Sequence, residues 1–257
     1  MTATVRALAT TPVKGLRVVG ASRLELGPSG APNDRRFHLV DDRGRMFNGK
    51  RTGVLNTVAA TYDAAARELG MTFDGGEVVT GVAELGEEID TTFYSQPLRA
   101  RIVQGPWSQA LSALAGQSLR LVACVDGSAL DRGRRGAVSL VSSASVAELA
   151  RAAGGEDVQP RRFRMLVEIE GVAAHEEDGW VGSAVQIGAA LVRMRGHVGR
   201  CVVTTRHPDS GDADLPTLDL LGSYRGDLDT TEPLAFGIYG EVLEGGAVAV
   251  GDAVRLA

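Results

Sequence analysis

One of the two cysteines in this chain lies in a segment rich in potential positive charge. Cys201 belongs to the segment GHVGRCVVTTRHPDSG, in which Arg200 directly precedes it and His197, Arg206 and His207 lie nearby. Neighbouring cations favour the thiolate, which is a nucleophile and a soft metal ligand. Alternatively, a lone cysteine on a strand packs in the core as a small apolar side chain. Successive residues of a strand point to opposite faces, so Arg200 need not contact the sulfur.

The same segment has weaker support for zinc binding or cysteine-protease chemistry. Zinc takes four ligands, or three and a water, and the segment contains neither a CxxC nor an HxxxH pattern. A cysteine protease needs a histidine and an orienting Asn or Asp close to the thiol in space, which the sequence does not show.

Three other segments bring cations to a tight loop or to the start of an expected strand. They are TPVKGLR at 11–17, NDRRF at 33–37 and QPRRFRMLVEIEG at 159–171. An arginine that faces inward is unfavourable unless it meets an anion. If these segments converge, they create an anion-binding cleft in a chain whose net charge is −5.

Composition limits the classes of function. The 257 residues are 44% hydrophobic and 23% charged, as expected for a globular protein, and the acidic balance argues against nucleic acid as a partner. Two cysteines form no disulfide framework, which favours free thiols in a reducing cytosol. The segment MTATVRALATTPVKGL lacks the apolar run of a signal peptide, and no segment approaches the roughly 20 apolar residues that cross a bilayer. We therefore expect a cytoplasmic protein with no membrane partner.

Short apolar runs separated by glycine predict a mainly β protein. We expect a strand at 22–27, a hairpin over 35–47 with its turn at 41–44, and two strands over 55–73, where an Ala-rich middle also tolerates helix. Residues 184–207 predict a strand, a turn, a long strand and then a strand that carries Cys201. Residues 237–257 are typical of another hairpin-rich, barrel-like stretch.

A few short helices complete the prediction. Glycine stops, serine caps and a first-turn proline indicate helices at 107–116, 143–155 and 215–226. The glycine- and charge-rich stretch 124–138 is the expected joint between an N-terminal and a C-terminal half, and the expected mobile loop.

Six segments resemble the MOSC family, the molybdenum cofactor sulfurase C-terminal domain family. In order along the chain they are TPVKGLR, DRRFHLVDDRGRMFNGKR, RRFRMLVEI, HEEDGWVG, GRCVVTTRHPDSG and LPTLDLLGSYR. The resemblance covers nearly the whole chain. Within the family, the chain is similar to the branch that contains the mitochondrial amidoxime reducing component and its bacterial relatives. It implies an N-terminal β-barrel-like domain at 1–120 and a MOSC β-barrel at 121–257, with the site between them.

The resemblance also implies a pyranopterin molybdenum cofactor. Cys201 is then the protein sulfur bound to molybdenum and the catalytic residue, and soft thiolate suits a soft metal–sulfur centre. The positions that match the family's cofactor contacts are Lys14, Gly15, Arg36, Arg164 and Cys201. Arg35 and Arg162 would take these roles if the register differs by one. The chain has Met165 and Leu166 where many members have Pro and Asn.

The function implied is reduction of N-hydroxylated small molecules. No iron–sulfur segment accompanies the matched region, so electrons are expected from a separate protein of ferredoxin, flavoprotein or cytochrome type. Pyridoxal phosphate binding is an expectation at the level of the family only. The alternatives are a non-redox sulfur carrier or cofactor-binding module that uses Cys201, and a MOSC fold that has lost the cofactor.

Overall fold

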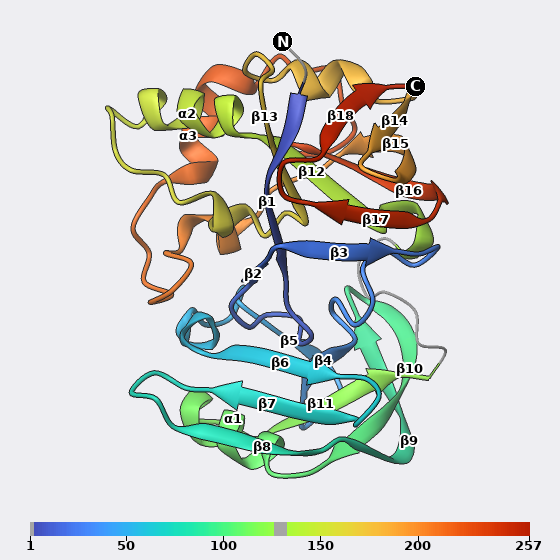
Figure 1. Ribbon diagram of the computed structural model, residues 1–257. Coiled ribbons are helices and arrows are strands. Elements are labelled where there is room, and N and C mark those ends of the chain that lie inside the picture. Colours follow the sequence, from blue (N-terminus) through green and yellow to red (C-terminus); the bar gives the residue numbers. More distant parts are fainter. Residues whose placement is uncertain (1–2, 126–132) are drawn as a thin grey trace.

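The chain folds into two halves that lie one above the other (Figure 1). The computed structural model describes residues 3–125 and 133–257, so residues 126–132 of the expected joint lie outside the described residues. The architecture is mainly β with three α-helices, as the sequence predicts.

The C-terminal half is a closed barrel of seven strands. In order around the barrel they are β13 (Val167–Glu170), β12 (Val138–Ser142), β16 (Ile238–Glu244), β15 (Ala190–His197), β14 (Ala184–Ile187), β18 (Ala253–Leu256) and β1 (Ala3–Thr10). The pairing of β1 with β13 closes the ring, and only the β12–β13 pair is parallel. A strand from the beginning of the chain therefore completes the C-terminal barrel.

The barrel is filled by apolar side chains from alternating strand positions. In β15, Val192 and Met194 are fully buried, whereas Leu191 and Arg193 are not. Such a period of two is what a strand with one face on a core requires. The short strands β2 (Val19–Ala21) and β3 (Arg23–Leu26) follow β1, and β3 pairs with β17 (Gly246–Ala249). Residues 237–257 thus form the three strands β16, β17 and β18. Of these, β17 pairs with β3 and not with β16 or β18.

The N-terminal half contains two further sheets. One has the order β5 (Met46–Phe47), β4 (Phe37–Asp41), β11 (Leu119–Cys124), β10 (Gln96–Gln104) and β9 (Glu84–Phe93). The other has the order β6 (Ala59–Asp63), β7 (Glu68–Thr72) and β8 (Val78–Val82). The hairpin predicted at 35–47 is confirmed as β4 and β5. The stretch 55–73 begins in a 3₁₀ turn, Val54–Thr57, and then forms the two strands β6 and β7, with no α-helix between them.

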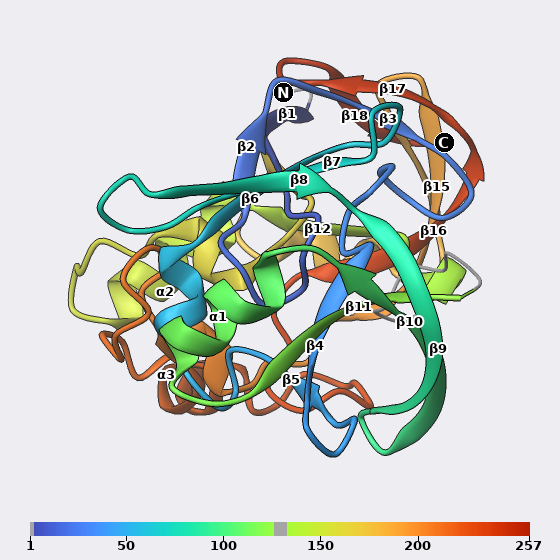
Figure 2. The ribbon, with the colours of Figure 1, turned by 90° about the horizontal axis from the view of Figure 1, so that it is seen from below.

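The three predicted helices are present. Helix α1 (Trp107–Ala115) contacts β11 and β8 between the two sheets of its half (Figure 2), and it ends at Gly116, whose φ of +66° is the left-handed conformation that glycine favours. Helices α2 (Ser143–Ala152) and α3 (Thr217–Arg225) lie together on one flank of the barrel (Figure 1). Within the described part of the chain, no helix has both the length and the apolar character needed to span a membrane.

Candidate functional site

A cavity of about 550 Å³ lies between the two halves. Its walls are loops and strand ends from both of them, including residues near 14, 35, 49 and 94 from the N-terminal half and residues near 137, 164 and 201 from the C-terminal half. Among the residues that the structure describes, six cationic side chains and two carboxylates line it. The cations are Lys14, Arg35, Lys50, Arg162, Arg164 and Arg200, and the carboxylates are Asp34 and Glu232. The cavity is therefore electropositive although the whole chain is acidic.

Cys201 lines this cavity and is half-buried. It lies outside the barrel wall, because β15 ends at His197. Beyond β15, Val198 bonds to the backbone of Phe236 and Gly237, and the Arg200 N–H donates to the Pro233 carbonyl, without forming a strand. The prediction that Cys201 sits on a strand is therefore wrong. It caps a single 3₁₀ turn, Val202–Thr205, and its carbonyl accepts hydrogen bonds from the backbone N–H and the hydroxyl of Thr204, both at 3.0 Å.

The physical reason for this error lies in the sequence VVTT. Four β-branched residues favour a strand, but threonine hydroxyls also bond back to carbonyls three residues earlier. Thr204 bonds to Cys201 in this way, and Thr205 bonds to Val202 at 2.7 Å. These contacts fix the turn that presents the thiol to the cavity.

Two arginines of the QPRRFR segment reach the cavity from a 3₁₀ turn, Pro160–Phe163. Arg162 is 3% exposed and donates to both carboxylate oxygens of Asp214, at 3.0 and 2.8 Å, and to the carbonyl of Thr204 at 3.1 Å. Arg164 has a positive φ of 54° and donates to the carbonyl of Leu16 at 2.6 Å. Arg162 thus ties down the turn that follows Cys201, and Arg164 connects the C-terminal wall to the N-terminal half.

Arg200 is a further residue of the site that the sequence analysis did not assign. Its guanidinium donates to the carbonyls of Phe236 and Phe163, each at 2.9 Å, and lies over the Phe163 ring at 5.2 Å. The side chain also donates to the sulfur of Met165 at 3.0 Å. Arg200 therefore holds the backbone directly before Cys201 against two other segments of the C-terminal half.

From the N-terminal half, Lys14 and Gly15 line the cavity, together with Arg35 rather than Arg36. Gly15 has a φ of +100°, and a Cβ there would lie 3.4 Å from Asn48. Arg35 lines the cavity, pairs with Asp34 and donates to the carbonyl of Arg164 at 2.8 Å. Arg36 is not among the residues that line the cavity.

The positions of Arg35 and Arg36 follow from the backbone. Arg35 has a positive φ of 52°, so the segment before β4 does not alternate as a strand would. The guanidinium of Arg36 lies instead over the ring of Tyr62, at 5.6 Å. A pattern based on period two could not have identified which of the two arginines enters the cavity.

The segment that follows Cys201 is clamped by the N-terminal half. Arg206 donates to the carbonyl of Gly49 at 3.1 Å, and Asn56 donates to the carbonyl of His207 at 3.0 Å. The backbones of Gly53 and Gly211 approach so closely that a Cβ on Gly53 would lie 1.8 Å from the Gly211 oxygen. Only glycine fits this crossing, and the crossing fixes the segment relative to the opposite wall.

His197, His207 and Asp209 do not line the cavity. His197 lies 3.7 Å from Asp178. Asp209 receives two hydrogen bonds from Arg161, at 2.7 and 2.6 Å, and these bonds lower the pKa of its carboxyl. Among the described residues, no three of the types His, Cys, Asp and Glu gather as metal ligands do.

Comparison with protein families gives two matches that together span most of the chain. Residues 2–99 match the MOSC N-terminal beta barrel domain, and residues 128–255 match the MOSC domain. The chain therefore belongs to the MOSC family, which is linked to molybdenum cofactor binding.

Similar solved structures were also found. The YuaD protein from Bacillus subtilis is 14% identical, with 99% of this chain and 94% of that chain covered and a TM-score of 0.46. YiiM from Geobacillus stearothermophilus is 20% identical, with 49% and 56% covered and a TM-score of 0.37. YiiM from Escherichia coli is 17% identical, with 48% and 55% covered and a TM-score of 0.35. No curated protein matches the chain.

Proposed function

We propose that the chain binds the molybdenum cofactor through Cys201 and reduces N-hydroxylated small molecules in the cytoplasm. The observation that carries the proposal is the shared cavity: the thiol of Cys201 and cations from three distant segments line one space. A dithiolene, a metal and a phosphate need a soft ligand and several cations, and this donor set provides both.

The residues present fit such a group. Arg162 lines the cavity, and its Nε is buried without a hydrogen-bond partner among the described residues. A buried donor of this kind is unfavourable unless something pairs with it. Cys201 would hold the metal, and Lys14, Arg35 and Arg164 would neutralise the phosphate. Asn48 also lines the cavity, and its amide oxygen accepts a hydrogen bond from the backbone N–H of Lys50 at 3.0 Å. Leu166 stands where many relatives have asparagine.

When bound, the cofactor would supply the two electrons that break an N–O bond. The balance of the reaction is one N–OH group, two electrons and two protons giving one N–H group and water. The electrons come from a separate protein of ferredoxin, flavoprotein or cytochrome type. The arginines of the site would orient anions through the fixed fork of their N–H donors.

Metal analysis tests this proposal. The protein is purified from cells that make the cofactor, and molybdenum is measured in the wild type, in Cys201→Ala and in the control Cys124→Ala. Cys124 is buried at the end of β11 and does not line the cavity. We expect near-stoichiometric molybdenum in the wild type and the control, and none in Cys201→Ala. Absence of the metal from all three would contradict the proposal and favour a fold that has lost the cofactor.

A second assay separates the reductase from a sulfur carrier. An amidoxime or hydroxylamine is incubated with the loaded protein and a reduced viologen dye as the artificial donor. Formation of the amidine or amine, lost in Cys201→Ala, supports the reductase. Metal without turnover, or a cyanide-releasable sulfur on Cys201, would instead favour the carrier. The thiol of Cys201 is half-buried, so it is accessible enough to carry a persulfide sulfur.

A further inference from the structure

Both lysines of the chain lie at one part of the cavity wall. The chain has 25 arginines but only two lysines, Lys14 and Lys50, and both line this cavity. The ammonium of Lys50 lies 4.8 Å from the ring centre of Tyr94, and that of Lys14 lies 5.5 Å from Phe93 and 5.8 Å from Tyr94. Lysine offers a compact point charge on a flexible stem, whereas arginine offers a rigid fork. The chain thus uses ammonium groups only around these two rings.

One of the two aromatic residues, Tyr94, occupies a backbone conformation that does not suit it. The turn between β9 and β10 has two central residues, Tyr94 with φ of +46° and Ser95 with φ of +66°. Positive φ at both positions defines the type I′ turn, for which Asn-Gly is strongly preferred. A bulky residue at positive φ is strained, and such strain is concentrated at ligand-binding sites. Tyr94 is therefore a poor turn residue, which is consistent with a role for its side chain.

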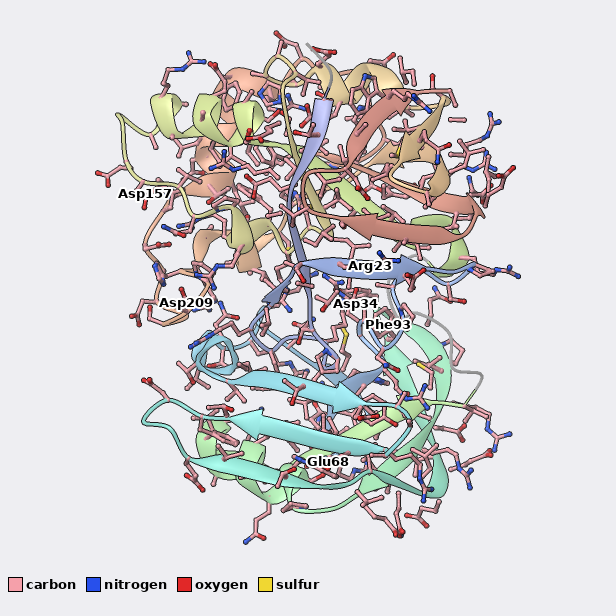
Figure 3. The ribbon with its side chains drawn as sticks, in the orientation of Figure 1. Arg23, Asp34, Glu68, Phe93, Asp157 and Asp209 are labelled. Atoms are coloured by element: carbon pink, nitrogen blue, oxygen red, sulfur yellow. The ribbon has the colours of Figure 1, made fainter. Side chains whose placement is uncertain are left out.

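This turn lines the cavity. Phe93 lies at the level where the two halves meet (Figure 3). Tyr94 is 48% exposed and Phe93 is half-buried. Their rings pack edge to face, with centroids 4.7 Å apart. Apolar ring surface that lines a cavity and faces solvent gains free energy when a flat ligand covers it.

We propose that Lys50, Phe93 and Tyr94 form a substrate subsite for a planar group that carries a negative charge, such as an aryl carboxylate. The inference rests on the proposed function, since these three residues line the same cavity as Cys201. The rings cover the flat face of the substrate, and the Lys50 ammonium pairs with its anionic substituent. Lys14 lies beside the same rings and adds positive potential, while the arginines of the C-terminal half remain with the cofactor.

Two substrates that differ only in charge test the subsite. Benzamidoxime is neutral, and 4-carboxybenzamidoxime carries a carboxylate. The variants are Lys50→Met, Tyr94→Ala and the control Arg23→Met, an exposed cation of β3 outside the cavity. We expect the wild type to favour the carboxylated substrate. Lys50→Met raises KM for that substrate about tenfold and leaves KM for benzamidoxime, kcat and molybdenum content unchanged. Tyr94→Ala raises KM for both substrates, and Arg23→Met changes neither.

Three outcomes would overturn the subsite. They are a wild type that does not discriminate between the substrates, a Lys50→Met variant that weakens both equally, and a Lys50→Met variant that loses molybdenum. The last outcome would assign Lys50 to the cofactor. Calorimetric titration of the protein with 4-carboxybenzamidoxime separates the two proposals. Binding that depends on Lys50 without turnover would sustain the subsite and contradict the reductase, whereas turnover without charge preference would do the reverse.

Discussion

The two walls of the cavity use their cations differently. On the C-terminal wall, Arg162 and Arg200 are bonded to a carboxylate and to backbone carbonyls, and they join the segments that surround Cys201. On the N-terminal wall, Lys14 and Lys50 lie over the rings of the β9–β10 turn. The forks of Arg162 and Arg200 therefore hold segments of the wall together, whereas the two lysines lie against aromatic rings. The number of cations around a cavity therefore does not show which of them contact a ligand. The partners that each cation already has in the protein are more informative.

The largest expected effect is on the C-terminal wall, where Arg162→Met removes a buried guanidinium from its ion pair with Asp214. The side chain of Arg162 is 1% exposed and that of Asp214 is 31% exposed. Removal of the cation leaves the Asp214 carboxylate without the Arg162 fork and the Thr204 carbonyl with the Thr217 hydroxyl as its remaining donor, so we expect a loss of about 3 kcal/mol in the free energy of unfolding. Urea denaturation monitored by circular dichroism measures it.

The neighbouring Arg161 supplies the matched control. It makes the same two-bonded pair with Asp209, but the two side chains are 37% and 35% exposed. A solvated pair contributes at most about 1 kcal/mol, so Arg161→Met should cost much less than Arg162→Met. If the two variants lost the same free energy of unfolding, burial would not be the reason why the Arg162 ion pair stabilises the fold.

A pH-dependent effect is expected behind the N-terminal wall, at His38. Burial, and next the charge of Lys14, lowers the pKa of His38 from 6.5 to about 4. The unfolded chain therefore binds more protons than the folded protein between these values, and stability is lost as pH falls through this window. The full contribution is about 3 kcal/mol, since one pKa unit corresponds to about 1.4 kcal/mol.

His38→Phe should flatten the stability profile between pH 7 and pH 4. Unfolding in urea at several pH values measures this, and a profile as steep as that of the wild type would contradict it. Burial chiefly lowers the pKa of His175 to about 4 as well, so His175 should still contribute to the pH dependence of stability in His38→Phe. In Lys14→Met, a positive charge near His38 is lost, so the pKa of His38 should rise. NMR titration of the four histidines follows the shift.

The sequence predicted the strands and helices better than it predicted the site. Period-two patterns identify strands such as β3 and β15 because one face of each lies on a core. The closure of the barrel is not local: β1 pairs with β13, about 160 residues later, and β17 pairs with β3. No short pattern encodes such long-range pairings.

Within the site, motif order indicated Lys14, Gly15, Arg164 and Cys201, and all four line the cavity. The choice between Arg35 and Arg36 depended on a single positive φ, which arginine rarely adopts and periodicity does not encode. Lys50, Phe93 and Tyr94 were missed as site residues. The scarcity of lysine in an arginine-rich chain was the signal that could have found Lys50.

A smaller and opposite effect is expected at the β9–β10 turn. The double variant Tyr94→Asn with Ser95→Gly places the preferred pair in the type I′ turn. Relief of the left-handed backbone at these positions should raise the free energy of unfolding by about 1 kcal/mol. The same variant should lose affinity for 4-carboxybenzamidoxime, because the tyrosine ring is gone. A variant that is less stable would show that the Tyr94 ring supports the fold and not a ligand.

The smallest expected change in stability belongs to the lysines themselves, and it tests the comparison of the walls most directly. Lys50 is exposed, and methionine keeps most of its apolar stem against Tyr94. Loss of the cation–π contact should be offset by apolar packing, so Lys50→Met should change the free energy of unfolding by less than about 0.5 kcal/mol. Urea denaturation next to Arg162→Met gives the contrast. If Lys50→Met were as destabilising as Arg162→Met, Lys50 would support the fold of the cavity wall. The cations of the N-terminal wall would then have the same structural role as those of the C-terminal wall.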